Sequence, residues 1–259
     1  MTPPLGKCVW GCGRDNFNRE HIVGQQIAKL LDLELPLTMH LGDFSRDGGE
    51  QVEVVLKDRV CVGCNSGWMR KLDNKMIAFM GDTFSTGTPV KLDEFRQRIL
   101  ARWAVKVALL LEVYLFDEAV RVPKLKAAGP FFAPDDNFPA LRKEHGPPKR
   151  TQVWIGKLET ATQPFTSHSS VITVSGTRAP YRRPTPIERG YESVFSLGPV
   201  ALAVTGYEIG WNGTPLLKRN TRKMLRIWPA AKQPVTWPPS SQITVRDLAS
   251  MTGMPPEWA

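Results

Sequence analysis

Four cysteines in two close pairs are the residues of this sequence whose types and spacing most clearly suggest chemistry. Cys8 and Cys12 form the first pair, and Cys61 and Cys64 form the second. Two short cysteine turns of this kind are typical ligands of a tetrahedral zinc ion, and a shell of four thiolates leaves no open position for a substrate water. The sequence therefore predicts a structural zinc site whose loss would unfold the surrounding region.

Disulfide bonding is the other common use of paired cysteines. The N-terminal sequence has no apolar segment of signal-peptide length, and the most apolar stretch, 105–116, is interrupted by Lys106 and Glu112. We therefore expect a soluble, cytoplasmic protein that does not enter the membrane. The reducing conditions of that compartment favour metal ligation over disulfides.

Three polar residues stand beside the cysteine pairs. Glu20 and His21 follow the first pair, and Asn65 directly follows the last cysteine. Because a shared zinc ion would draw the two pairs together, we expect His21 and Asn65 to be neighbours. A neutral imidazole can accept a proton from water near pH 7, and carboxylate and amide oxygens suit Mg²⁺. Together these groups would supply a base and a Lewis acid for phosphodiester hydrolysis.

Each of these three residues also has a simpler interpretation. His21 could be an ordinary surface or core histidine. Glu20 could be a solvated acid at the start of a helix, where the helix dipole favours it. Asn65 could be the N-cap of a helix that begins after the second pair. The mutual geometry of the side chains is the deciding test.

The order of these motifs resembles that of the HNH endonucleases of the ββα-metal superfamily, in their zinc-stabilised form. The resemblance rests on C-x3-C, EHIVGQ and VCVGCNSGWM, and it covers roughly residues 8–80. The segments RWAVKVALLLE, IWP and WPP are more weakly similar to larger bacterial and phage proteins that carry this nuclease motif. The resemblance implies a metal-dependent DNA endonuclease that nicks or cuts DNA, with phage defence and phage DNA processing as the two settings.

The resemblance also implies a role for each residue of the candidate catalytic site. His21 matches the histidine that activates the attacking water. Glu20 matches an acidic residue, usually aspartate, that binds a catalytic Mg²⁺ or Mn²⁺, and Asn65 matches a second ligand of the same ion. The middle asparagine of the motif has no match, since Asp58 is the only short polar residue in the corresponding stretch VVLKDRV.

The net charge of +9 makes nucleic acid the first partner to consider, and we expect double-stranded DNA. Basic and acidic residues nearly balance in residues 1–90, so the excess positive charge lies downstream. Within a stretch without acids, 214–232, the candidate phosphate contacts are Lys218, Arg219, Arg222, Lys223 and Arg226. A solvated basic face is the alternative for this group.

Two other functions remain open at this stage. One is a non-catalytic, zinc-stabilised protein that binds nucleic acid, in which Glu20, His21 and Asn65 are structural. The other is a nuclease that acts on RNA. Cleavage assays on single- and double-stranded DNA and RNA separate these functions.

The expected fold class is α+β. Residues 1–85 would form the HNH-like ββα-metal nuclease domain with its structural zinc, and residues 90–259 would form a basic α+β region that binds DNA or regulates the nuclease. The second region is expected to contain a long helix at 92–116 and a mostly antiparallel sheet packed on it.

The local patterns of the sequence predict further elements. Apolar spacing favours a helix over 20–33, and alternation favours a strand over 51–60. A helix that begins after the second cysteine pair is expected to end at Gly81. Residues 131–149 are expected to form a long loop or a set of turns. The remaining expected elements are strands at 152–158, 170–175, 191–197, 200–207 and 224–228, and a short helix at 245–252.

Overall fold

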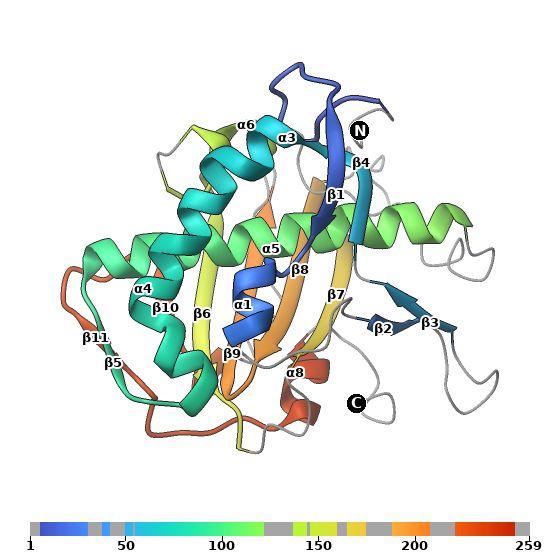
Figure 1. The fold of residues 1–259 in the computed structure, drawn as a ribbon. Helices are drawn as coiled ribbons and strands as arrows, with labels where there is room; N and C mark the ends of the chain where they lie inside the picture. The colour runs from blue at the N-terminus through green and yellow to red at the C-terminus, as the bar shows by residue number, and fades with distance from the viewer. Residues whose placement is uncertain are drawn as a thin grey trace, which may run out of the picture.

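The protein is a mixed helix and sheet structure in which every sheet is antiparallel across the described residues (Figure 1). A computed structural model describes residues 6–30, 38–41, 50–53, 55–121, 137–143, 146–159, 165–174, 188–207 and 221–251. The expected α+β class is therefore confirmed. Among the described helices, none combines the length and the apolar character needed to cross a bilayer.

Two paired strands form the centre of the N-terminal part. Strand β1 (Phe17–His21) runs antiparallel to β4 (Val55–Cys61), with Phe17 opposite Cys61 and His21 opposite Val55. Between these two strands the chain forms α1 (Gln25–Leu30), β2 (Thr38–Leu41) and β3 (Glu50–Glu53). The pairing places the first cysteine turn beside the end of β4, where the second begins.

A nearly continuous helix follows β4. It consists of α3 (Val62–Cys64), the π-helical turn η1 (Asn65–Met69) and α4 (Arg70–Thr86). The expected end at Gly81 is wrong, because α4 continues to Gly87, whose left-handed φ of 75° makes it the C-cap. Gly81 instead faces α1: a Cβ there would lie 3.6 Å from a methyl carbon of Leu30.

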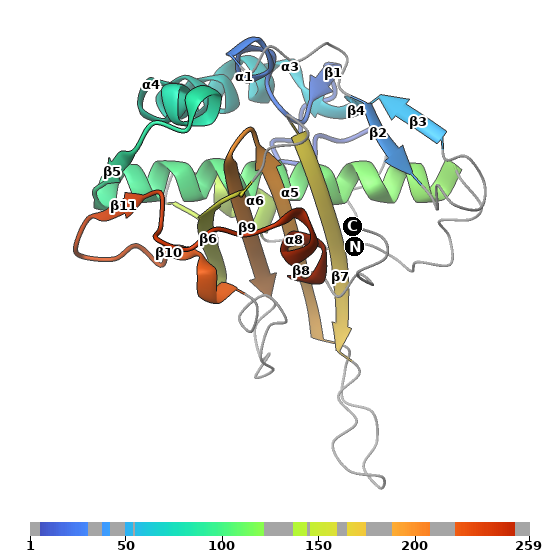
Figure 2. The same ribbon diagram turned by 90° about the horizontal axis from the view of Figure 1, so that it is seen from below.

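The long helix α5 (Glu94–Arg121) forms the middle layer of the molecule (Figure 2). On one side lie β1, β4 and α4, and on the other lies the main sheet. Every residue from 99 to 114 is buried, as expected for a helix covered on all sides. The ring of Trp103 contacts both layers, 5.7 Å from the ring of Phe84 and 6.1 Å from that of Phe195, centre to centre.

The main sheet has five strands in the order β10-β6-β9-β8-β7. They are β6 (Thr151–Lys157), β7 (Phe165–Val174), β8 (Glu188–Leu197), β9 (Val200–Tyr207) and β10 (Leu225–Trp228). All five overlap the strands expected from sequence, and the sheet packs on α5 as expected. Helix α8 (Val245–Met251) contacts β8, so the short C-terminal helix is also confirmed.

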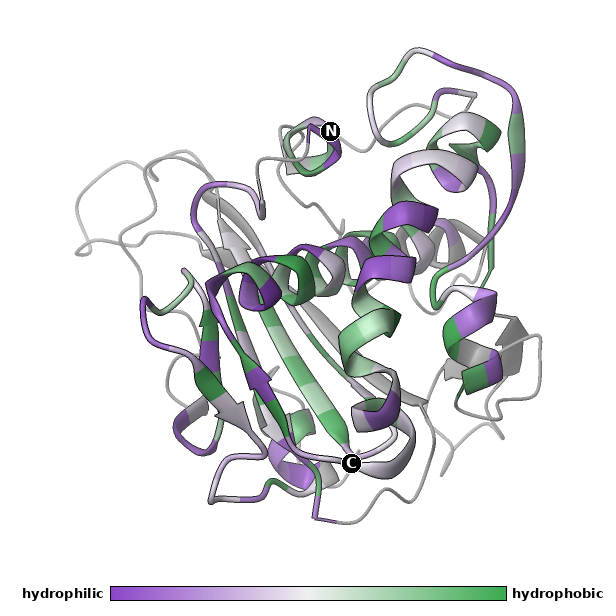
Figure 3. Ribbon diagram, turned by 60° about the vertical axis from the view of Figure 1, so that its left-hand side comes forward, coloured by the Kyte–Doolittle hydropathy of each residue, from purple (hydrophilic) through white to green (hydrophobic). Residues whose placement is uncertain are grey.

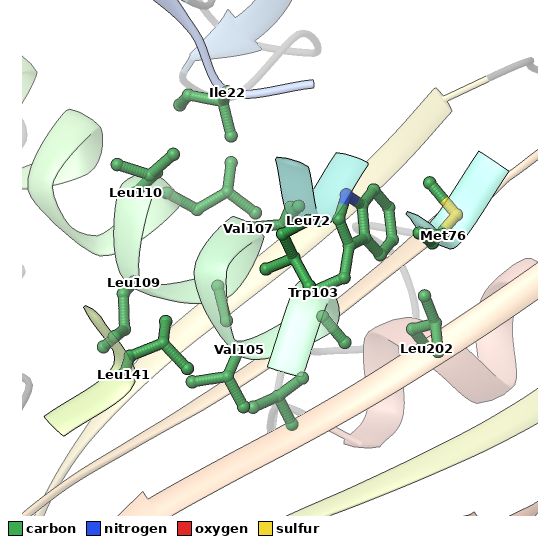
Figure 4. Packing of buried hydrophobic residues seen from close by; sticks show 14 of the residues in the cluster. Ile22, Leu72, Met76, Trp103, Val105, Val107, Leu109, Leu110, Leu141 and Leu202 are labelled. Carbon is green, nitrogen blue, oxygen red and sulfur yellow. The ribbon is translucent and has the colours of Figure 1, made fainter. Parts of the chain in front are cut away.

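Apolar side chains from the two outer layers meet around α5. Ile22, Leu72 and Met76 from the N-terminal layer and Leu202 from β9 surround α5 side chains that include Trp103 (Figure 4). Apolar residues concentrate on α5 and the central strands, whereas hydrophilic residues recur along α4 (Figure 3). The regions 1–85 and 90–259 therefore share one core where they are described, and their division into two domains stays a prediction.

Two local expectations are wrong. Residues 20 and 21 belong to strand β1, and the helix begins only at Gln25, because pairing with β4 overrides the helical spacing of the apolar residues. The segment 131–149 contains a helix, α6 (Asn137–Arg142), within its described part. Its Leu141 is buried against α5 and its carbonyl oxygen accepts two hydrogen bonds from Arg102, so tertiary contacts hold this short helix.

Two further short elements complete the described chain. Strand β5 (Val90–Leu92) pairs with β11 (Val235–Trp237), which ties the start of α5 to the C-terminal segment. A 3₁₀ turn, η3 (Thr221–Lys223), stands directly before β10.

Candidate metal centre and the adjacent polar site

The four cysteine sulfurs lie together at the end of the β1–β4 pair. All four ligand atoms fall within 4.8 Å of one another, and the sulfurs of Cys12 and Cys61 are 3.4 Å apart. A tetrahedral ion with Zn–S bonds of about 2.3 Å needs sulfurs roughly 3.8 Å apart. The donor set and its spacing therefore fit a structural metal such as zinc, as the sequence predicted.

Backbone amides support the sulfur cluster. The amide of Cys61 donates to the sulfur of Cys8 at 3.5 Å, and the amide of Cys64 donates to the sulfur of Cys61 at 3.3 Å. In the first turn, Gly11 adopts a φ of 62° and donates from its amide to the carbonyl of Cys8 at 3.0 Å. Such donors stabilise thiolate charge and fix the ligands in place.

The second cysteine turn is covered by a basic side chain. A Cβ on Gly63 would lie 1.9 Å from the Nη1 atom of Arg14, so a larger residue there would displace the arginine side chain. Arg14 therefore lies directly over the turn between Cys61 and Cys64. Its positive charge would partly offset the negative charge of four thiolates around one divalent ion.

The thiols of Cys8 and Cys64 differ in how readily they lose a proton. A hydrogen bond from Cys64 lowers the pKa of the Cys8 thiol, and the same bond raises the pKa of Cys64. Four thiols this close cannot all ionise without a counter-charge. A divalent cation supplies that charge, so binding would release protons and become stronger as the pH rises.

Glu20 and Asn65 are brought together beside this cluster. The Glu20 side chain is buried, with 4% of its surface exposed, and the Asn65 side chain lies within hydrogen-bonding reach of its carboxylate. Burial raises the pKa of the Glu20 carboxyl to about 7. Nearby Lys106 opposes that rise, Asp73 reinforces it, and the Asn65 hydrogen bond opposes it. Two oxygen donors of the kind that hold Mg²⁺ are therefore adjacent.

The backbone around this pair excludes two of the simpler interpretations. Asn65 has helical angles, φ −61° and ψ −59°, whereas an N-cap residue is extended. Cys61 is the extended N-cap, and its sulfur accepts from the amide of Cys64. Glu20 is a buried strand residue and not a solvated acid at a helix start.

His21 is the last residue of β1 and is half-buried. Opposite β1, strand β4 bulges between Leu56 and Val60, the partners of Glu20 and Asn18. Asp58 lies in this bulge with a left-handed φ of 57° and an exposed side chain. At the position that corresponds to the middle asparagine of the motif, this chain therefore has an irregular turn. This turn shapes the strand next to His21.

Sequence reasoning missed three residues that surround this site. The Asp73 carboxylate of α4 accepts hydrogen bonds from Trp103 and Lys106 of α5. The available signal was the composition of α5: a lysine within a helix that is apolar on every side must be buried, and a buried ammonium needs a partner.

The predicted phosphate contacts are only partly described. Lys218 and Arg219 lie outside the described residues. Arg222, Lys223 and Arg226 are exposed on η3 and β10, and Lys223 forms an ion pair of 3.2 Å with Asp247. These elements lie across α5 from β1 and α4 (Figure 2), so this basic group is not adjacent to Glu20.

Comparison of this chain with models of protein families, with curated proteins and with solved structures finds no match.

Proposed function

We propose that this protein is a metal-dependent DNA endonuclease of the HNH type. The observation that carries the proposal is the contact between Glu20 and Asn65 beside four clustered cysteines. A buried carboxylate and an amide from distant parts of the sequence meet where a hard divalent cation needs both. The cysteine cluster would hold a structural zinc, and the chemistry would take place at the neighbouring polar site.

The residues take distinct roles in this proposal. The Glu20 carboxylate and the Asn65 side-chain oxygen would hold a catalytic Mg²⁺ or Mn²⁺. His21, the last residue of β1 and next to Glu20, accepts the proton of the water that attacks phosphorus. A bound divalent cation would stabilise the charge that develops on the phosphate and the leaving oxygen.

The local topology supports the same interpretation. Two antiparallel strands, β1 and β4, are followed by a helix that starts at the second cysteine turn. Glu20 and His21 end the first strand, and Asn65 begins the π-helical turn that leads into α4. This order of strand, strand and helix is the order that the resemblance to ββα-metal nucleases implies.

Cleavage assays on plasmid, linear double-stranded DNA, single-stranded DNA and RNA test the proposal. We expect cleavage of double-stranded DNA in Mg²⁺ or Mn²⁺ that stops when EDTA is added. His21→Ala and His21→Asn should abolish cleavage while one zinc ion per chain and the thermal unfolding temperature stay unchanged. Ser66→Ala is the matched control, because Ser66 is exposed next to Asn65.

Undiminished cleavage by both His21 variants would contradict the proposal. The alternative is a zinc-stabilised protein that binds nucleic acid without cutting it. Binding that weakens steeply with salt, together with no cleavage of any of the four substrates in either metal, would favour that alternative. Preferred cleavage of RNA would retain the site and change its substrate.

A further inference from the structure

The carboxylate of Asp73 joins the candidate site to the long helix α5. Its Oδ1 atom accepts hydrogen bonds from Nε1 of Trp103 at 2.8 Å and from Nζ of Lys106 at 2.5 Å. Its Oδ2 atom lies against Gly24, where a Cβ would be 3.0 Å away. Gly24 belongs to the turn that directly follows β1, so one carboxylate contacts both α5 and that turn.

Lys106 is fully buried, with 0% of its surface exposed. Its charge acts on Glu20 as well as on Asp73. Removing two charges from water is costly, and apolar replacement of a buried ion pair often leaves a protein equally stable or more stable. Fold stability is therefore a weak reason for this pair, whereas the contact of Asp73 with the turn after β1 suggests a functional one.

We propose that Lys106 is a positioning residue for the candidate catalytic site, acting through Asp73 on the turn after Glu20 and His21. This inference rests on the proposed endonuclease function. The ammonium of Lys106 holds the Asp73 carboxylate in place, and that carboxylate holds the Gly24 turn. The metal-binding geometry of Glu20 then depends on α5, which lies outside the motif-bearing segment.

The competing interpretation is an ion pair that only joins α4 to α5. The chain offers a matched control for it, because Arg59 of β4 pairs with Asp117 of α5 through two hydrogen bonds. Arg59 is also buried, and this pair also connects the N-terminal layer to α5. Neither Arg59 nor Asp117 is among the groups whose charges shift the pKa of Glu20.

The test compares the zinc-loaded full chain with two double variants, Lys106→Met with Asp73→Asn, and Arg59→Met with Asp117→Asn. Calorimetric Mn²⁺ titration measures the metal site without activity, and single-turnover cleavage measures the reaction. We expect the first variant to lose about 10–100-fold in Mn²⁺ affinity and in cleavage rate, the usual range for outer contacts of a metal site. Its zinc content and DNA affinity should not change, and the second variant should match the wild type in all four measurements.

Equal effects of the two double variants, or no effect of the first, would overturn the positioning role. If the first variant does not fold, Gly24→Ala tests the positioning role in its place. This substitution removes no charge and adds a methyl group next to the Asp73 carboxylate. That variant should keep its zinc and bind Mn²⁺ more weakly, and unchanged Mn²⁺ affinity overturns the role.

The wild-type protein separates this inference from the function on which it rests. A wild type that neither binds Mn²⁺ through Glu20 nor cleaves nucleic acid overturns both proposals. A wild type that does both, while the Lys106 variant behaves like its control, overturns only the positioning role.

Discussion

The Asn65 side chain lies within hydrogen-bonding reach of the Glu20 carboxylate, although Glu20 belongs to β1 and Asn65 to the turn after the second cysteine pair. Two features bring them together: the antiparallel pairing of β1 with β4, and the four-cysteine cluster at the end of that pair. The cysteine cluster therefore helps to set the geometry of this polar pair.

Removal of the structural metal is expected to disrupt the N-terminal layer. Trp10 lies between the first two cysteines, and its ring packs edge-on against Trp68, 4.9 Å away centre to centre. A zinc chelator, or Cys61→Ser, should therefore abolish the near-ultraviolet circular dichroism of these rings and lower the unfolding temperature. Ser66→Ala should keep both, and full retention of zinc and signal by Cys61→Ser would contradict the assignment.

The metal-binding role proposed for Glu20 and Asn65 can be tested without unfolding the protein. Glu20→Gln retains a hydrogen-bond acceptor for Asn65 but removes the negative charge, so the protein should stay folded with its zinc. Its Mn²⁺ affinity should fall by at least about 10–100-fold, the range typical of substitutions around a metal site. Asn65→Ala should weaken Mn²⁺ binding similarly, whereas Asn65→Asp should retain it. Calorimetric titration measures all three, and unchanged affinity in Glu20→Gln would remove Glu20 from the ligand set.

Glu112 should make stability depend on pH. Its side chain is 2% exposed on α5, neither oxygen has a hydrogen-bond partner among the described residues, and burial raises its pKa from 4.5 to about 8. Because the folded pKa is higher, the unfolded chain releases this proton first as the pH rises. The free energy of unfolding should therefore fall between about pH 5 and pH 8, by up to several kcal/mol, and level off above that range.

Glu112→Gln tests this dependence, because the amide has a similar shape and does not ionise. Denaturant unfolding of zinc-loaded protein at several pH values should give a shallower slope for the variant. Glu20, whose pKa is also raised, to about 7, would leave a smaller slope behind. Identical slopes for variant and wild type would show that Glu112 does not titrate in this range.

Two groups of exposed basic side chains could contact DNA, one on η3 and β10 and the other on α4, and variants of each group distinguish them. Alanine at Arg222, Lys223 and Arg226 should reduce the slope of log affinity against log salt by roughly 0.9 for each phosphate that these side chains no longer neutralise. The fold should tolerate this change, since all three are exposed and the ion pair of Lys223 with Asp247 is a surface pair worth about 0–1 kcal/mol.

The matched variant replaces Arg70, Lys71 and Lys75, which are exposed on α4 in the layer of the candidate site. Binding measured at several salt concentrations decides between the faces. If the slope of log affinity against log salt changes only in the α4 variant, the phosphate contacts lie on α4. That result would contradict the assignment made from sequence.

Much of the local structure follows from short-range patterns. The alternating runs of the C-terminal half became β6 to β10, and the periodic apolar residues of 92–116 became most of α5. The cysteine spacing predicted the cluster, because two turns of fixed geometry can aim four sulfurs at one point. The same reasoning failed at Glu20, where spacing suggested a helix and long-range strand pairing gave β1.

The sequence by itself determined which residues form the cysteine cluster, the presence of a long buried helix and an antiparallel sheet, and the candidate roles of Glu20, His21 and Asn65. Only the tertiary structure decided that Glu20 and Asn65 come within reach of each other and that the charge of Lys106, bonded to Asp73, acts on Glu20. Spacing along a chain fixes turns and faces, because these depend on neighbouring residues. Which faces meet depends on the shared packing of α5 between two layers, and that packing involves residues far apart in the sequence.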